Sequence, residues 1–563
     1  MEAPPPTRLR AHRALVGVCV GLTTVEALCL VALGPDGALA LAPQVTAPEP
    51  FGILHDLRWL AVFHRSWLAF SVELVALLVF RTGVVVTLTA LAWDRDRPRP
   101  PVKVLVACAL RFLAVVAAVS FAWVTVMFAL AVVSLEWLFF VGVPAFLLIA
   151  LVTHHGVVRA RWWREAPPLR TTAWLAFVFV ELSLAGALAA AVPTPLAVLV
   201  AAGSGLFNAW AWLSIVHVLN GSPGVLRFRP VAPAAIALLA TVTLLGVAIG
   251  ARQLGRVDQT RPAPAVAAAV MPTTGAASAP AVLVATGFNS EWDGTASRPL
   301  APDLVPARFS YRGLGADGRP LPYAADSTHR SLRALIRTMR AQVDALHDRT
   351  GRPVSLVAES EGSIVAAAML AVHPRAPVGT LVLLSPLVHP GRVYYPPEDK
   401  DGWGVVTGWA LRGITEVVDG VSSIDLPADA PLLRSIDANA AVLRNLLACA
   451  SGHRTELVVM PVTAALGAPN PPDIGAPVIV VPAVHGGLLS NPTARAAVVG
   501  AIRGRHPARD ATWAGVEGAL RLVAAPWQVP ELPITLNPAW APRATTGGSG
   551  CVRMTRAEQR RLG

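Results

Sequence analysis

Long apolar stretches dominate the first half of this chain. Hydrophobic residues make up 54% of its 563 residues, and many of them gather in runs almost free of charge. A run of about twenty such residues is long enough to cross a bilayer as a helix. We predict seven spans: Ala14 to Leu33, Trp67 to Trp93, Phe112 to Val133, Leu135 to Val152, Ala173 to Val192, Leu196 to Leu219 and Val231 to Ala251. Only Ser134-Leu135-Glu136 separates the third from the fourth, so that pair could also be divided differently.

The first apolar run is interpreted as a span rather than a cleaved signal peptide. It is long, and no small-x-small cleavage site stands before the next run. The predicted fold class therefore begins with an α-helical transmembrane bundle of about seven helices, over residues 1–251.

Basic residues predict which way the bundle faces. They occupy alternate loops: Arg8, Arg10 and Arg13; Arg95, Arg97, Arg99 and Lys103; Arg159, Arg161, Arg164 and Arg170; Arg227 and Arg229. Short loops rich in Arg and Lys stay in the cytoplasm, so an odd number of spans puts the second half of the chain outside. Arg252, Arg256 and Arg261 follow the last span against this rule, and an error of one helix would reverse the orientation.

Ionisable residues interrupt the apolar runs. They are Glu26, Glu73, Arg81, Arg111 and Glu181. A charge inside the bilayer costs several kcal/mol unless it is paired or hydrated, so each marks a candidate site. Two interpretations stay open: Glu–Arg pairs that hold the bundle together, or a polar pocket for a lipid head group or a proton.

The second half of the chain has a different pattern. Short apolar runs bounded by turn residues alternate with helical segments, which favours a mostly parallel sheet wound with helices. The predicted strands lie at 281–285, 309–313, 353–357, 380–386, 457–460 and 477–482. We place a flexible linker rich in Ala, Pro and Thr at 252–280, an α/β domain at 281–540 with an insertion at 388–431, and a disordered basic tail at 541–563.

One pentapeptide carries the main chemical signal. Ala358-Glu359-Ser360-Glu361-Gly362 follows a predicted strand and opens an Ala-rich helical segment. A sharp strand-to-helix turn between small residues exposes a serine hydroxyl beside a general base. The alternative is an ordinary helix cap, since Ser is also favoured at that position.

This motif resembles the Gly-x-Ser-x-Gly elbow of the α/β-hydrolase fold, with Ala in place of the first Gly. The resemblance implies that Ser360 is the nucleophile of an esterase- or lipase-like enzyme. It implies that His485, on the loop after the last strand, is the general base. The backbone N–H groups of Phe288 and Glu361 would form the oxyanion hole, and the insertion would be a lid.

The acid of the triad is the point where the resemblance fails. Members of the fold usually carry it just beyond the strand before the histidine strand, where this chain reads Pro461-Val462-Thr463-Ala464-Ala465. The first carboxylate after it is Asp473, and Asp399 in the insertion is the next candidate. A weakened or absent activity is therefore one hypothesis.

Composition adds exclusions. The net charge of +12 follows from arginines in loops and tail, and no nucleic-acid motif accompanies it. Five cysteines form no disulfide framework, and only Cys449 and Cys551 are left for an extracytoplasmic bridge; we predict no metal or cofactor. We therefore expect a multi-pass cell-membrane protein with an extracytoplasmic serine hydrolase or acyltransferase domain acting on an ester, a lipid or envelope ester being favoured. The alternatives are a catalytically degenerate binding domain on a membrane anchor, and a seven-helix transporter or receptor with an accessory hydrolase.

Overall fold

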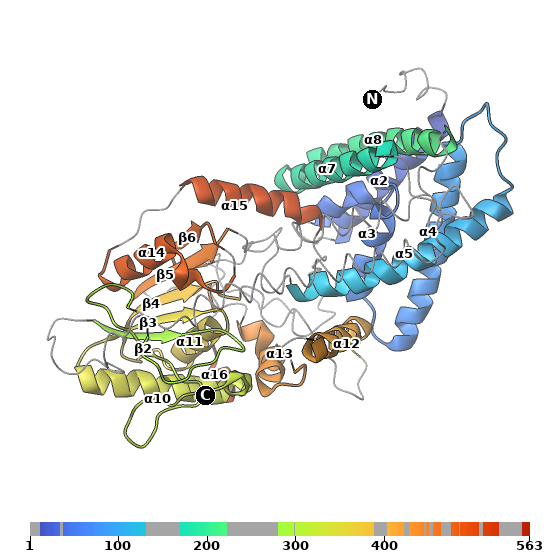
Figure 1. Ribbon diagram of the computed structural model, residues 1–563. Helices are drawn as coiled ribbons and strands as arrows, with labels where there is room; N and C mark the ends of the chain where they lie inside the picture. Colours follow the sequence, from blue (N-terminus) through green and yellow to red (C-terminus); the bar gives the residue numbers. More distant parts are fainter. Residues whose placement is uncertain are drawn as a thin grey trace.

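In the computed structural model, an N-terminal helical region is followed by an α/β domain with a parallel sheet (Figure 1). The structure describes residues 12–33, 38–130, 169–221, 280–297, 299–387, 402–421, 427–443, 446–449, 454–462, 474–483, 485–505, 511–527 and 554–563. The predicted spans 135–152 and 231–251 and almost all of the linker at 252–280 lie outside these residues.

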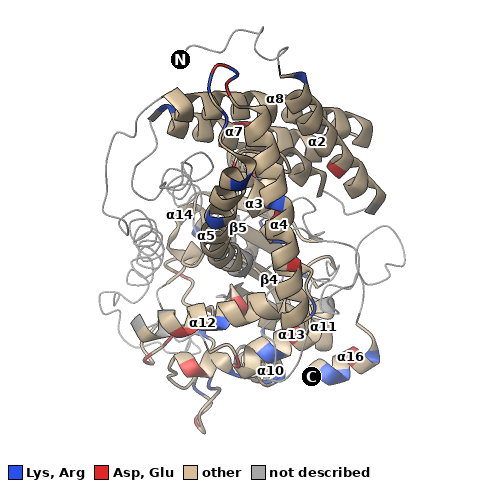
Figure 2. Ribbon diagram, turned by 90° about the vertical axis from the view of Figure 1, so that its right-hand side faces the viewer, with Lys and Arg blue, Asp and Glu red and all other residues tan. Residues whose placement is uncertain are grey.

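Five described helices are long and apolar enough to cross a membrane, and they coincide with five of the predicted spans. They are α2 (Arg13–Leu33), α4 (Trp67–Leu91), α5 (Val102–Leu130), α7 (Leu169–Ala191) and α8 (Thr194–Gly221). Figure 2 shows how few charged residues these helices carry. Helix α5 begins at Val102 rather than at Phe112, because Lys103 and Arg111 lie on its exposed side and do not interrupt its packing face.

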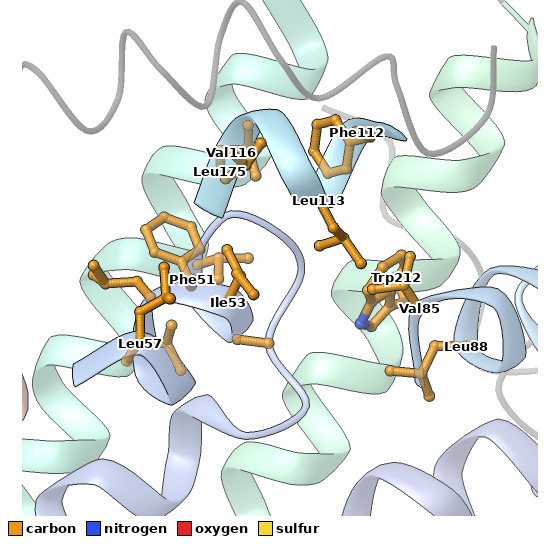
Figure 3. Close-up of a cluster of buried hydrophobic side chains, with 14 of the residues drawn as sticks. Phe51, Ile53, Leu57, Val85, Leu88, Phe112, Leu113, Val116, Leu175 and Trp212 are labelled. Atoms are coloured by element: carbon orange, nitrogen blue, oxygen red, sulfur yellow. The ribbon is translucent and has the colours of Figure 1, made fainter. Parts of the chain in front are cut away.

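A segment between the first two spans forms an element that the hydropathy pattern did not predict. The 3-10 turn η1 (Ala38–Gln44) and the helix α3 (Phe51–Val62) are almost wholly buried among the long helices. Non-helical backbone at this depth is tolerated where protein surrounds it. Phe51, Ile53 and Leu57 of α3 pack with side chains from α4, α5, α7 and α8 in one apolar cluster (Figure 3).

Helices α2 and α8 pack unusually closely. A Cβ on Gly205 would lie 2.4 Å from Thr23 Oγ1 and 2.8 Å from the carbonyl oxygen of Cys19. Small residues at a helix crossing let two backbones approach, which is how helices associate when lipid removes the hydrophobic driving force.

The ionic residues predicted inside the spans have mixed surroundings. Arg81 is buried and donates from Nε to Asp56 of α3 over 2.7 Å and from Nη1 to the Val45 carbonyl over 2.8 Å. Glu26 lies 3.6 Å from His55, and Glu181 accepts a hydrogen bond from Ser204 over 3.2 Å. Pairing within the bundle thus accounts for Arg81, although its nearest carboxylate comes from α3 and not from another span.

The α/β domain is built on a six-stranded parallel sheet in the order β2-β1-β3-β4-β5-β6. The strands are β1 (Ala281–Ala285), β2 (Ala307–Arg308), β3 (Val354–Glu359), β4 (Val378–Leu384), β5 (Thr455–Pro461) and β6 (Val478–Val481). Five of the six predicted strands are confirmed. The prediction at 309–313 is wrong, because Ser310 Oγ accepts hydrogen bonds from the N–H groups of Arg312 and Gly313 and closes a turn there.

Helices cover both faces of the sheet. Alternate residues of β1 divide between two cores: Leu283 packs toward α10 (Leu332–Thr350) and α11 (Glu361–Val372), and Val284 packs toward α14 (Pro492–Ile502). This is the period-2 alternation of a strand buried on both sides. In Figure 1 α14 and α10 lie on opposite sides of the strands.

The end of the chain corrects one prediction. Residues 556–562, placed in a disordered tail, form helix α16 (Arg556–Leu562). Thr555 and Glu558 make a capping box at its start, and Leu562 is buried in the core that contains α10 and α11. A local cap and a single apolar anchor outweigh the polar composition of this segment.

Two segments join the α/β domain to the bundle. Helix α12 (Val405–Val421), inside the predicted insertion, packs on α3 and α5: His64 Nε2 accepts the Val406 N–H over 2.9 Å, and Thr407 Oγ1 donates to the Ala61 carbonyl over 2.7 Å. Helix α15 (Ala511–Ala524) leads to the turn η6 (Ala525–Trp527), which enters the bundle beside α7. Figure 1 shows α15 between the sheet and α7.

The turn η6 is held by buried polar contacts. The Pro526 carbonyl accepts hydrogen bonds from Arg58 over 2.5 Å and from Gln44 over 2.6 Å. The Trp527 ring stacks on Phe179 at 4.7 Å between centroids, and its Nε1 donates to Ser183 over 2.9 Å. The two halves of the chain are therefore connected by side-chain contacts as well as by sequence.

Candidate active site

Ser360 occupies a sharp turn between β3 and α11. Its backbone has φ 54° and ψ −118°, a conformation that costs a non-glycine residue free energy and marks a constrained turn. The turn fits because its neighbours are small. A Cβ on Gly287 would lie 2.9 Å from Ser360 Cβ, and a Cβ on Gly362 would lie 2.8 Å from the Thr286 carbonyl oxygen.

The structure brings Ser360 and His485 together, as the sequence predicted. Ser360 Oγ lies 2.9 Å from His485 Nε2. His485 is buried, on the loop that follows β6. Parallel strands end at the same edge of a sheet, so residues 125 positions apart meet at the carboxyl ends of β3 and β6.

Glu359, the last residue of β3, holds the loop of the histidine in place. Its carboxylate accepts the Leu488 N–H over 3.0 Å, and the N–H of Gly487 also hydrogen-bonds to it. Burial raises the pKa of Glu359, and these two backbone donors offset that rise only in part. The residue just before the serine thus fixes the loop that supplies the imidazole.

Ser385 is a member of the site that the sequence did not predict. Its Oγ lies 2.9 Å from His485 Nδ1, and its side chain is fully buried at the end of β4. Its backbone also has a positive φ, of 49°. The only signal for it in the sequence is its place near the end of the predicted strand 380–386.

The two predicted oxyanion donors belong to neighbouring turns. Phe288 lies on the loop after β1, where its ring stacks on His329 at 4.7 Å between centroids. His329 Nε2 is 2.6 Å from Asn289 Oδ1, and the Asn289 N–H donates to Thr328 Oγ1. These two hydrogen bonds hold the loop that contains Gly287 and Phe288, and Gly287 lies beside Ser360.

Glu361 opens α11, so its N–H belongs to the first turn, where helices leave donors without an intrahelical acceptor. Its side chain is 2% exposed, and neither carboxyl oxygen has a hydrogen-bond partner within the described part of the chain. Burial raises the pKa of Glu361 well above its usual range.

Asp473 and Asp399, the two predicted candidates for the acid, lie outside the described residues. Within the described ranges no cluster of His, Cys, Asp and Glu is arranged to hold a metal ion. The contacts that the structure describes at the site run from Ser360 through His485 to Ser385.

No protein-family model matches the chain, and no curated protein matches it.

Proposed function

We propose that the α/β domain is a serine hydrolase or acyltransferase that acts on an ester, with Ser360 as nucleophile and His485 as general base. The observation that carries this proposal is the 2.9 Å contact between Ser360 Oγ and His485 Nε2 at a strained strand-to-helix turn. A serine that only capped the helix would accept a backbone N–H with its side chain, and Ser360 makes no such capping bond.

The proposed reaction has two steps. Ser360 Oγ attacks the acyl carbon while its proton moves to His485 Nε2, and the N–H groups of Phe288 and Glu361 hold the negative oxygen. The imidazolium then gives that proton to the departing alcohol, which leaves an acyl–serine ester. Water releases the acid in a hydrolase, and a second alcohol takes the acyl group in a transferase; His485 removes the proton from either one.

Strand order supports assignment to the α/β-hydrolase fold. The serine strand β3 lies between β1, which leads to the Phe288 loop, and β4, and the histidine strand β6 ends the sheet. Ligands of open parallel sheets bind at the carboxyl ends of the strands, which is where Ser360, Ser385 and His485 all lie.

Contacts within the bundle support an extracytoplasmic position for this domain. His12 bonds to the Leu91 carbonyl over 2.8 Å and His217 lies 3.1 Å from Asp94, so the basic loop after α4 gathers with the start of α2 and the end of α8. The domain contacts the bundle elsewhere, through α12 near His64 and through η6 beside the second half of α7. Positive charge marks the cytoplasmic end, so the domain is assigned to the other side.

The bundle also bears on the substrate. Helix α12 belongs to the insertion that would cover the site, and it is seated on α3 and α5. We propose that an ester reaches Ser360 from the bilayer, which favours a lipid or envelope ester over a small soluble one.

Fluorophosphonate labelling of the purified full-length protein tests the proposal. The probe should attach to Ser360 in the wild type and should not attach to His485→Ala at a comparable rate, because the base is needed to activate the hydroxyl. Absence of wild-type labelling, together with no turnover on a panel of lipid and short-chain esters, would instead favour a binding domain without catalysis.

A further inference from the structure

Two serines at adjacent strand ends contact the same imidazole. Ser360 directly follows β3 and Ser385 directly follows β4, and each lies 2.9 Å from one of the two ring nitrogens of His485. Both have positive φ, and within the described residues the only other non-glycine with positive φ is Asn289, on the oxyanion loop. Strained backbone gathers where the surrounding structure enforces a function.

Ser385 is held firmly enough to set the direction of a ring. Its N–H donates to the Val459 carbonyl of β5 over 2.8 Å, so the exit of β4 is anchored to the next strand. Its side chain is fully buried, and the hydroxyl therefore meets the imidazole away from bulk water.

The tautomer of a neutral histidine follows from the partner of each nitrogen. A base that takes the Ser360 proton at Nε2 must carry its own hydrogen on Nδ1. An oxygen that accepts the Nδ1–H favours this tautomer, and an acceptor also stabilises the imidazolium that forms later.

We propose that Ser385 is a positioning residue that accepts the Nδ1–H of His485 and so presents the Nε2 lone pair to the Ser360 hydroxyl. This inference rests on the proposed function of Ser360 and His485. The Nδ1 hydrogen stays on its nitrogen throughout. In the first step Nε2 passes the Ser360 proton to the leaving group, and in the second step it takes the proton of the incoming water or alcohol and returns it to Ser360 Oγ. A hydroxyl carries no charge, so it orients the ring but attracts the imidazolium less than a carboxylate would.

The test uses the full-length protein and the rate at which a fluorophosphonate labels Ser360 across pH. Ser385→Ala should slow labelling roughly ten- to hundred-fold, a part of what general-base catalysis contributes. Ser355→Ala is the matched control, because Ser355 is a buried serine on β3 at the far end of the strand from Ser360 and should leave the rate unchanged.

A pair of variants of equal size separates orientation from packing. Ser385→Asp places a charge beside the imidazole and should move the acid limb of the rate profile to higher pH by about one unit or more. Ser385→Asn has the same volume without the charge and should not move it. Identical profiles for the two variants, or an Ala variant as fast as wild type, would overturn the proposal.

Modification of His485 by diethyl pyrocarbonate provides a readout that needs no turnover. Its rate follows the neutral imidazole, so the pH midpoint should rise in Ser385→Asp and stay near the wild-type value in Ser385→Asn. A midpoint that ignores Ser385→Asp would contradict the contact itself. If wild-type Ser360 is not labelled but this midpoint still shifts, the proposed function is wrong, while the contact between Ser385 and His485 is supported.

Discussion

Two buried polar assemblies of this molecule differ in their chemistry: one is an ion pair in the bundle, and the other is a set of hydrogen bonds around an imidazole. In the bundle, the guanidinium of Arg81 meets the carboxylate of Asp56 at 2.7 Å, with Glu49 at 3.8 Å. At the strand ends, the two ring nitrogens of His485 contact the hydroxyls of Ser360 and Ser385, and both serines have strained backbone. Ion pairing on ordinary backbone indicates a structural role, whereas strained backbone at groups that share one imidazole indicates a group arranged to act.

The largest expected effect comes from the contact between Ser360 and His485. Ser360→Ala and His485→Ala should each abolish ester hydrolysis, and the double variant should lose hardly more than either single variant, since residues acting as one unit are strongly non-additive. Initial rates on a lipid ester and thermal unfolding midpoints give the measurement. Hydrolysis that survives Ser360→Ala would reduce the elbow to a helix cap.

The predicted acid sharpens the same half of the comparison. If Asp473 orients His485, Asp473→Asn should lower kcat by about 10² to 10⁴, as loss of the acid does in serine proteases. Paired with Ser385→Ala in a double-mutant cycle, it measures whether the two groups act on one imidazole, because coupled partners give non-additive losses. An unchanged kcat would eliminate Asp473 and leave orientation to Ser385.

The sequence predicted that Ser360 and His485 act together, but not that Ser385 contacts His485, and the reason is physical. The elbow depends on residues that are close together in the sequence. Its sharp turn requires small residues around Ser360, and these are visible in the sequence. Strand ends converge in any parallel sheet, so His485 after the last strand could also be placed. The position of Ser385 depends on the register that sets Leu384, the last residue of β4, opposite Glu359, the last residue of β3, and on a left-handed residue directly after β4; composition predicts neither.

The same limit applies in the membrane half. Hydropathy locates long helices because lipid demands about twenty apolar residues, and five described helices agree with it. It does not locate η1 and α3, whose burial comes from tertiary contacts with the long helices. The partner of Arg81 is on α3, so a search restricted to the spans would pair it with the wrong carboxylate.

The bundle pair gives the next prediction. Arg81→Met should destabilise the protein by about 3–5 kcal/mol, because it leaves Asp56 buried without its cation. The rate of fluorophosphonate labelling per folded molecule should stay near wild type. Arg111→Met, at an exposed position of α5, is the matched control and should change neither quantity. A labelling defect in folded Arg81→Met would show that the ion pair also serves the site.

The smallest effect concerns the contact between the two halves. His64 is buried, donates from Nδ1 to the Leu60 carbonyl over 2.7 Å and accepts the Val406 N–H at Nε2 over 2.9 Å, so only its neutral form satisfies both bonds. Burial lowers the pKa of His64 to about 4, below the value of about 6.5 in an unfolded chain. The unfolded state then binds the proton more readily, and stability should fall as pH drops from about 6.5 toward 4.

We expect α12 to loosen from the bundle over that range, with protease cleavage between residues 402 and 421 becoming faster as the pH is lowered. His64→Gln keeps an acceptor toward Val406 and does not titrate, so it should flatten this dependence. His347→Gln, at the end of α10 and outside the bundle, should leave it as in the wild type. If a steep acid dependence persists in His64→Gln, other titratable groups cause the loosening. The contact between α12 and the bundle would then not depend on the charge of His64.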